Sequence, residues 1–155
     1  MTVGAALNHV GVRVDDLDAA VRFYADGFGL ERVPAPSFGA PVVWLRAGSL
    51  QLHLTESATK QPSPGHFALA VDDFGAIYRW ASARGVLLRG PDGSAVFELP
   101  GGECQLYVHD PGGNVVEVCH RDAARWRSEI PEMVPLADLY PQNADAGRAT
   151  LFLDS

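Results

Sequence analysis

The chain has 155 residues, of which 47% are hydrophobic and 20% charged, values that are ordinary for a single globular domain. Its formal net charge of −7 argues against a nucleic-acid partner, since such proteins cluster Lys and Arg against phosphates. No apolar run approaches the ~18 residues of a membrane span, and the N-terminus lacks the features of a signal peptide. Two cysteines make no disulfide framework, so we expect a cytoplasmic protein that does not bind membranes.

The first third of the chain predicts a strand, a helix and three further strands. Residues 7–14 alternate in polarity with period two, as a strand does. A helix over 17–25 follows, capped by Asp16 or Asp18 and ended by Gly27 and Gly29. Short strands are then expected over 30–33, 42–47 and 50–55, with Gly48 and Ser49 forming the hairpin turn between the last two.

The second third predicts the same order of elements. We expect a strand over 66–71, a helix over 74–84 ended by Gly85, and strands over 86–89, 104–109 and 114–120, with an extra hairpin around 95–99. The remainder, 121–155, predicts an extension that lies across the body of the protein or across a partner subunit, with a helix over 122–130 ending at Pro131.

The two thirds are copies of one unit. His9 and His66 stand 57 positions apart, and each opens a strand that ends in Asp-Asp before a helix. At the same offset Ala19 corresponds to Ala76, Arg22 to Arg79 and Phe23 to Trp80. Such a repeat predicts two related modules, each with a histidine on its first strand.

Strand periodicity places four potential metal ligands on the side of the sheets that no helix covers. Apolar residues occupy the alternate positions, which leaves His9, His53, His66 and Glu117 on the opposite faces. Taken singly, each would more often be an exposed or hydrogen-bonded residue. Together, two repeat-related imidazoles and a carboxylate flanked by valines favour a divalent metal, because a buried carboxylate is costly without a cation.

Other residues of these faces are candidates for substrate contacts. The loop 110–113 decides the register of the last hairpin, and the apolar pattern favours a loop of three or five residues, which puts Tyr107 beside Glu117 and turns Cys104 and Cys119 to opposite faces. Trp44, Arg46 and Arg13 share the open face of the first module. They predict either contacts to an anionic or aromatic substrate or a solvated surface, and Tyr107 either lines the site or packs at its rim.

Several segments resemble the vicinal oxygen chelate superfamily, the group of glyoxalases, bleomycin resistance proteins and extradiol dioxygenases. The resemblance rests on Leu-Asn-His at 7–9, the Asp-Asp-Leu turn at 15–17, Phe-Tyr at 23–24, Gly-Phe-Gly-Leu at 27–30 and the ending Tyr-Val-His-Asp-Pro-Gly-Gly-Asn-Val-Val-Glu at 107–117. It implies an α+β fold of two βαβββ modules whose curved mixed sheets form a metal-binding cup. On it, 5–56 and 66–120 are the modules of one domain, joined by a linker at 57–65.

By the same resemblance His9 and His66 are ligands from the first strands and Glu117 is the ligand from the last strand. His53 falls at the position of a fourth ligand and is either that ligand or a residue that contacts substrate. One divalent ion per chain is expected, with iron, manganese, nickel and zinc all suited to these donors.

Three reaction classes compete. A glyoxalase-type lyase or isomerase would use the metal as a Lewis acid on a small substrate with vicinal oxygens, with Glu117, Tyr107 and His53 as candidate catalytic residues. An extradiol-type dioxygenase matches the pattern from Leu106 to Glu117, but the histidine that such enzymes carry upstream is missing at 98–100. A metal-free drug-binding protein would usually lack the ligands. Residues 90–102 show no clear match to the potassium loop of the fosfomycin thiol transferases.

Exposed strand edges further predict a homodimer.

Overall fold

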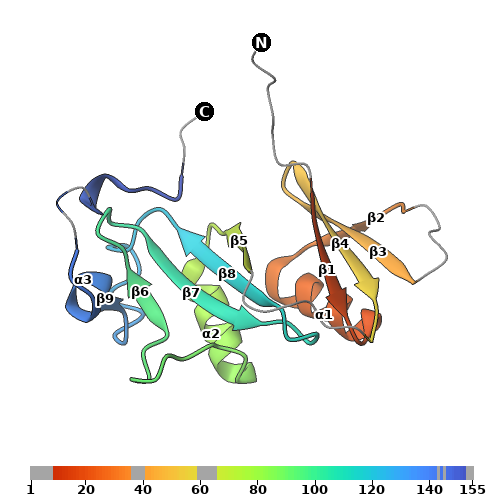
Figure 1. Ribbon diagram of the computed structural model, residues 1–155, viewed down its shortest axis with the longest axis horizontal. Helices are drawn as coiled ribbons and strands as arrows, with labels where there is room; N and C mark the ends of the chain where they lie inside the picture. The colour runs from red at the N-terminus through yellow and green to blue at the C-terminus, as the bar shows by residue number, and fades with distance from the viewer. Residues whose placement is uncertain (1–8, 36–40, 59–65, 143, 145, 153–155) are drawn as a thin grey trace, which may run out of the picture. The chain divides into compact units, whose positions relative to one another are not determined.

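The computed structural model describes residues 9–35, 41–58, 66–142, 144 and 146–152. The chain forms two compact units (Figure 1), which are described separately below. The first unit is Met1–Gly65 with Asp110–Asn114, and the second is His66–His109 with Val115–Ser155. Apart from Asp110–Asn114, the second unit begins at His66, where the second copy of the sequence repeat also begins.

The first unit is one mixed sheet with a helix on one face (Figure 1). The strand order is β1-β4-β3-β2, in which β1 is parallel to β4 and the other neighbours are antiparallel. The elements are β1 (His9–Val14), α1 (Leu17–Phe28), β2 (Glu31–Val33), β3 (Val42–Ala47) and β4 (Leu50–Glu56).

Helix α1 begins and ends at residues that the sequence marks. Asp16 is the N-cap, and its carboxylate accepts a hydrogen bond of 2.8 Å from the amide of Ala19. The helix passes Gly27 and ends at Phe28, three residues later than predicted. Its C-cap is Gly29, whose φ of 66° only glycine adopts readily. Its buried side packs against β3 and β4.

The second unit repeats this plan with one added strand. The order is β5-β8-β7-β6-β9; β5 is parallel to β8, and β9 is parallel to β6. The elements are β5 (His66–Ala70), α2 (Phe74–Arg84), β6 (Val96–Glu98), β7 (Cys104–His109), β8 (Val115–His120) and β9 (Val134–Pro135), followed by α3 (Leu136–Leu139) and a 3-10 helix (Ala146–Arg148). Both units are therefore βαβββ modules with mixed sheets, which confirms the predicted fold class.

Two predicted elements are wrong. The segment 86–89 is not a strand but a single bridge between Leu87 and Val108, because the chain turns away at Gly90 after only two hydrogen bonds to β7. The segment 122–130 is a series of turns rather than a helix. It buries Ala123, Trp126 and Ile130, a spacing that a helix shares, but its backbone bonds to Gly102 and folds on itself by short-range turns.

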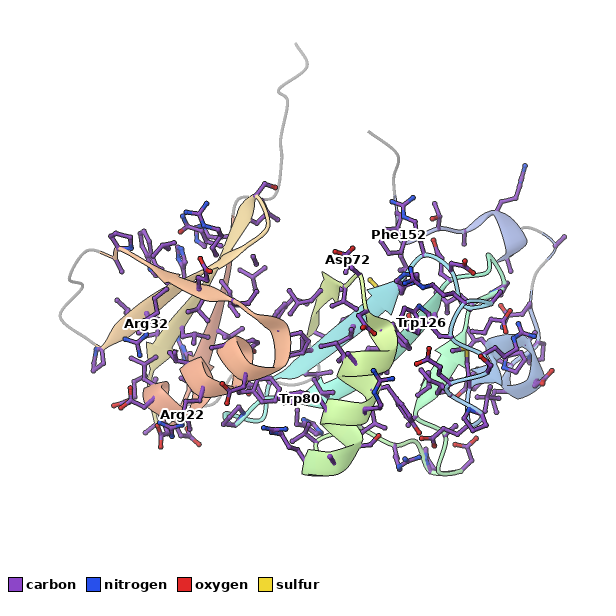
Figure 2. All side chains as sticks on the ribbon, turned by 180° about the vertical axis from the view of Figure 1, so that it is seen from behind. Arg22, Arg32, Asp72, Trp80, Trp126 and Phe152 are labelled. Carbon is purple, nitrogen blue, oxygen red and sulfur yellow. The ribbon has the colours of Figure 1, made fainter. Side chains whose placement is uncertain are left out.

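The described part of the C-terminal extension packs within the second unit. Trp126 is 4% exposed and Ile130 is fully buried, and Figure 2 shows Trp126 beside α2. A Cβ on Gly75 of α2 would come within 2.9 Å of the Trp126 ring, so only glycine permits this packing. Further along, the buried carboxylate of Glu103 accepts hydrogen bonds from the hydroxyl of Thr150 and the amide of Leu151.

A charged network also joins the extension to α2. The carboxylate of Glu132 accepts hydrogen bonds from the guanidinium of Arg89, at 2.7 and 3.2 Å, and from the hydroxyl of Tyr78. The guanidinium of Arg79 donates to Glu129 at 2.9 Å. The hydrogen bonds from Arg89 first, and then from Tyr78, lower the pKa of Glu132.

Glu132→Gln is expected to destabilise the protein near neutral pH and to leave it unchanged in acid. The lowered pKa means that the folded state favours the ionised carboxylate. Its contribution is therefore present above the unfolded pKa and lost as the pH falls through the folded value. Urea titration should find the variant less stable by about 1 kcal/mol at pH 7, as for a partly exposed ion pair, and close to wild type near pH 3. An equal difference at both pH values would contradict this assignment.

The loop between β7 and β8 belongs to the first unit although its flanking strands belong to the second. Asp110 is 4% exposed, and its carboxylate accepts hydrogen bonds from the hydroxyl of Tyr24 at 2.9 Å and from the backbone and side-chain amides of Asn114 at 2.8 and 2.9 Å. The side chain of Asn114 also donates to the carbonyl of Arg13. Gly112 lies so close to Val14 that a Cβ there would meet its Cα at 2.9 Å.

None of the helices in the described part of the chain has the length and apolar character that crossing a bilayer requires.

Candidate functional site

The two modules present their candidate residues in the same register. In the first unit Gly11 is opposite His53, and His9 precedes Gly11 by two residues on the same face. In the second unit Ala68 is opposite Glu117, and His66 precedes Ala68 by two residues. Each module therefore sets a first-strand histidine diagonally beside a last-strand residue on the face away from its helix, as the sequence predicted.

In the first unit His9 and His53 are in contact. Their rings are stacked with centroids 4.2 Å apart, and the ring of Trp44 stacks on the other side of His53 at 4.1 Å. His53 Nε2 lies 2.9 Å from Oε1 of Gln51, on the same strand face. Burial, and then the proximity of His9, lower the pKa of His53. The neutral imidazole, which is the form that binds metals, is thereby favoured.

In the second unit His66 and Glu117 are in contact. His66 Nε2 is 3.0 Å from Oε2 of Glu117. Tyr107 is opposite Glu117 in the β7–β8 pairing, and its ring meets the His66 ring edge-on at 5.6 Å. The loop spans the five residues 110–114, so the predicted odd-length loop and the position of Tyr107 are confirmed.

The phenol of Tyr107 is held in its protonated form. Burial first, and then the negative charge of Glu117, raise the pKa of Tyr107 to about 12. The side-chain amide of Gln105 donates a hydrogen bond of 3.0 Å to the phenol oxygen, which leaves the phenol proton for another acceptor. Near neutral pH Tyr107 is thus a hydrogen-bond donor.

Glu117 is the residue whose surroundings most favour a cation. The residue is 5% exposed, and its buried Oε1 has no hydrogen-bond partner among the described residues. A buried carboxylate with an unpaired oxygen is unfavourable unless a positive group neutralises it. Imidazole and carboxylate donors suit divalent iron, manganese, nickel and zinc, so the residues present fit the metal that the resemblance implies.

The predicted ligands are found as two pairs, one in each unit. Within neither unit do the described residues include a group of three or more His, Cys, Asp or Glu side chains that could hold a metal ion. The cysteines are not candidates: both thiols are free, and burial raises the pKa of Cys104 to about 12 and that of Cys119 to about 11.

The open face of the first unit carries the three predicted substrate residues. Trp44 and Arg46 lie on β3 and Arg13 on β1, all on the face with His53. Sequence reasoning did not single out Gln51 and Gln105, which orient His53 and Tyr107. Each stands two residues before its partner on the same strand, so strand periodicity could have placed it on the same face, although it could not predict the hydrogen bond.

With this geometry in view, comparison with known proteins is decisive for the family. The sequence model of the glyoxalase/bleomycin resistance protein/dioxygenase superfamily matches residues 6–118. The chain belongs to this superfamily. The match ends before the C-terminal extension.

Solved structures share the superfamily fold. Lactoylglutathione lyase from Agrobacterium tumefaciens is 28% identical, with a TM-score of 0.52 over 76% of this chain and 95% of its own. The oxidase ChaP-H2 is also 28% identical, with a TM-score of 0.61 over 80% and 98%. The fosfomycin resistance protein FosX from Listeria monocytogenes, 17% identical, has a TM-score of 0.63 over 82% and 98%, which is a likeness of fold alone. No curated protein sequence matches the chain.

Proposed function

We propose that the protein is a divalent-metal-dependent enzyme that acts on a small substrate with vicinal oxygens by lyase or isomerase chemistry. The observation that carries this proposal is Glu117, a buried carboxylate that has one oxygen unpaired among the described residues and the other beside His66, on the strand to which the resemblance assigns a ligand. The 28% identity to lactoylglutathione lyase supports the same class of reaction.

In this proposal His9, His66 and Glu117 hold the metal, with His53 as a fourth ligand or as the base. A bound divalent ion would supply Lewis acidity toward the oxygens of the substrate. Tyr107 donates its phenol proton in a hydrogen bond to an oxygen on which negative charge develops. In a site shielded from water such a donor contributes ~3 kcal/mol to the transition state.

His53 has the properties of a proton carrier. Its lowered pKa keeps the imidazole neutral near pH 7. With Oε1 of Gln51 accepting from Nε2–H, the lone pair lies on Nδ1, which can take a proton from substrate and return it. The stacked rings of His9 and Trp44 fix the plane of the imidazole while it does so.

The experiment that tests the reaction class combines metal analysis with two assays. Elemental analysis of protein purified without added metal identifies the ion. Hemithioacetal isomerisation with Ni²⁺ or Zn²⁺ is then compared with oxygen uptake by the Fe²⁺-loaded protein on a panel of catechols. We expect isomerisation and no stoichiometric oxygen uptake. Silence in both assays, with no bound metal and tight binding of an aromatic drug, would instead indicate a drug-binding protein.

A second candidate is oxygen-dependent chemistry of the dioxygenase or oxidase type. The oxidase ChaP-H2 is as similar in sequence as the lyase and has the higher TM-score. Oxygen consumed in step with substrate by the Fe²⁺-loaded protein, and lost in Tyr107→Phe, would establish this alternative.

We further propose that the protein is a homodimer. The strand β1 ends the sheet of the first unit and β5 ends that of the second, and such edges are commonly covered by a partner. Tyr140, 61% exposed, and Leu151, 45% exposed, add apolar surface on the extension. Sedimentation velocity at micromolar concentration is expected to give the mass of a dimer, and a single monomeric boundary would refute this.

A further inference from the structure

We propose that the open face of the first unit binds a planar organic anion, with the planar group over Gly11 and the negative group held by Arg13. This inference rests on the proposed function in one respect, because the anion is placed beside His9 and His53. It names the chemical class of the substrate. Three observations support it: the space over Gly11, the stacked rings beside that space, and the arginines of the same face.

The first observation is the open space over Gly11. Gly11 is exposed on β1 with His9 and Arg13 on either side of it on the same face and His53 opposite it on β4. A Cβ built on Gly11 would meet no atom within 4 Å. The φ of Gly11 is not positive, so its backbone does not require glycine. The missing side chain is therefore explained better by the space that it leaves than by the fold.

The second observation is the stack of flat rings at the edge of this space. His9, His53 and Trp44 form one continuous stack, with 18° between the planes of the first two and 3° between those of the last two. A planar group that binds over Gly11 contacts this stack, because aromatic rings interact favourably in offset-stacked or edge-to-face arrangements.

The third observation is the state of the arginines. Most arginines of the described residues are engaged by carboxylates, aromatic rings or other groups. Within the described part of the chain, the guanidiniums of Arg13, Arg22 and Arg46 are in no ion pair and on no aromatic ring. Two of these three, Arg13 and Arg46, lie on the open face of a protein whose net charge is −7.

The strand geometry ranks the two arginines. Arg13 is two residues from Gly11 on the same strand, about 7 Å between Cα atoms, and the hydrogen bond from Asn114 to its carbonyl anchors its backbone. Arg46 is two strands away, with Glu31 opposite it on β2, roughly 12 Å from Gly11. Arg13 therefore makes the direct contact with the anion, while Arg46 adds to the positive field of the face.

The test uses 2-naphthoate as the probe and neutral 2-naphthamide as its matched control, titrated calorimetrically into the full-length protein as purified and after EDTA treatment. We expect 2-naphthoate to bind with a dissociation constant of ~1 mM under both conditions and 2-naphthamide to bind about tenfold more weakly. Arg13→Gln should lower the affinity for 2-naphthoate about tenfold, and Arg46→Gln about two- to threefold.

Two further variants separate binding from folding. Gly11→Leu should fill the space, weaken both probes about tenfold, and leave the midpoint of thermal unfolding within ~2 °C of wild type, because a Cβ at this position meets no atom within 4 Å. Arg22→Gln on α1, at the helix-covered face (Figure 2), removes another unengaged arginine and should change nothing.

Equal binding of the acid and the amide, or unchanged affinity in both Arg13→Gln and Gly11→Leu, would overturn the inference. Binding that disappears with EDTA would also overturn it, since the carboxylate would then be held by the metal. Binding of 2-naphthoate by a protein that takes up no metal would contradict the proposed function and support this inference, so the two can fail separately.

Discussion

Glu117→Ala is expected to lower the affinity of the metal-free protein for Mn²⁺ or Ni²⁺ by at least ~100-fold, since losing even an outer-shell partner commonly costs 10–100-fold. Calorimetric titration should show one site per chain in the wild type and none in the variant. Unchanged affinity would remove Glu117 from the metal site.

The same substitution should not destabilise the metal-free protein. Glu117 is buried, and its Oε1 has no partner among the described residues, so its carboxylate destabilises the folded state until a cation is bound. We expect the thermal midpoint of metal-free Glu117→Ala to equal or exceed that of metal-free wild type. Added metal should raise the midpoint of the wild type alone, because only a ligand of the native state stabilises it.

Glu132→Gln is the matched control for Glu117→Ala. It also removes a carboxylate of the second unit, but one that is bound by Arg89 and Tyr78 on the opposite side of the sheet from the candidate ligands. Its metal affinity should be that of the wild type. A similar loss in both variants would indicate a general effect of charge rather than ligation.

Asp110→Ala is expected to destabilise the protein by about 3 kcal/mol, because it leaves a buried phenol and two amides without their acceptor. Tyr24, whose pKa is raised well above its ordinary value by burial and by Asp110, cannot recover the lost hydrogen bond from water. Urea titration measures the change.

Tyr24→Phe and the double variant complete the cycle. Tyr24→Phe alone should cost about 1 kcal/mol, and the double variant should cost less than the sum, since the two residues share one hydrogen bond. Strict additivity, or a loss below ~1 kcal/mol in Asp110→Ala, would mean that the loop is held by other contacts.

Much of the fold could be read from the sequence because its signals are local. Asp16 and Gly85 mark helix ends through capping and left-handed geometry, and the alternation in β4 and β7 fixes which side chains face the helices. The two failures have different causes. Residues 86–89 have strand composition but too few partners, and 122–130 has helical spacing only because turns also bury every third or fourth residue.

The candidate site was likewise predictable only in part. Periodicity alone put His53 on the face of His9, and Tyr107 and Glu117 on the face of His66. It could not predict that Gln51 and Gln105 orient their neighbours, that Trp44 stacks on His53, or that Oε1 of Glu117 lacks a partner, because these depend on side-chain rotamers and burial. Whether all four predicted ligands bind one ion stays a prediction.

The packing of the C-terminal extension has a consequence for where the gene can be divided. The superfamily match ends at residue 118, yet Ala123, Trp126 and Ile130 are buried and β9 supplies the outermost strand of its sheet. The stretch that matches the superfamily therefore ends before the stretch that packs together in the second unit. A truncation or fusion at residue 118 would remove Trp126 from α2, where only Gly75 leaves room for it, and would expose the backbone of Phe97. In the intact chain the outermost strand β9 contains Pro135, which has no backbone N–H to donate to a further strand.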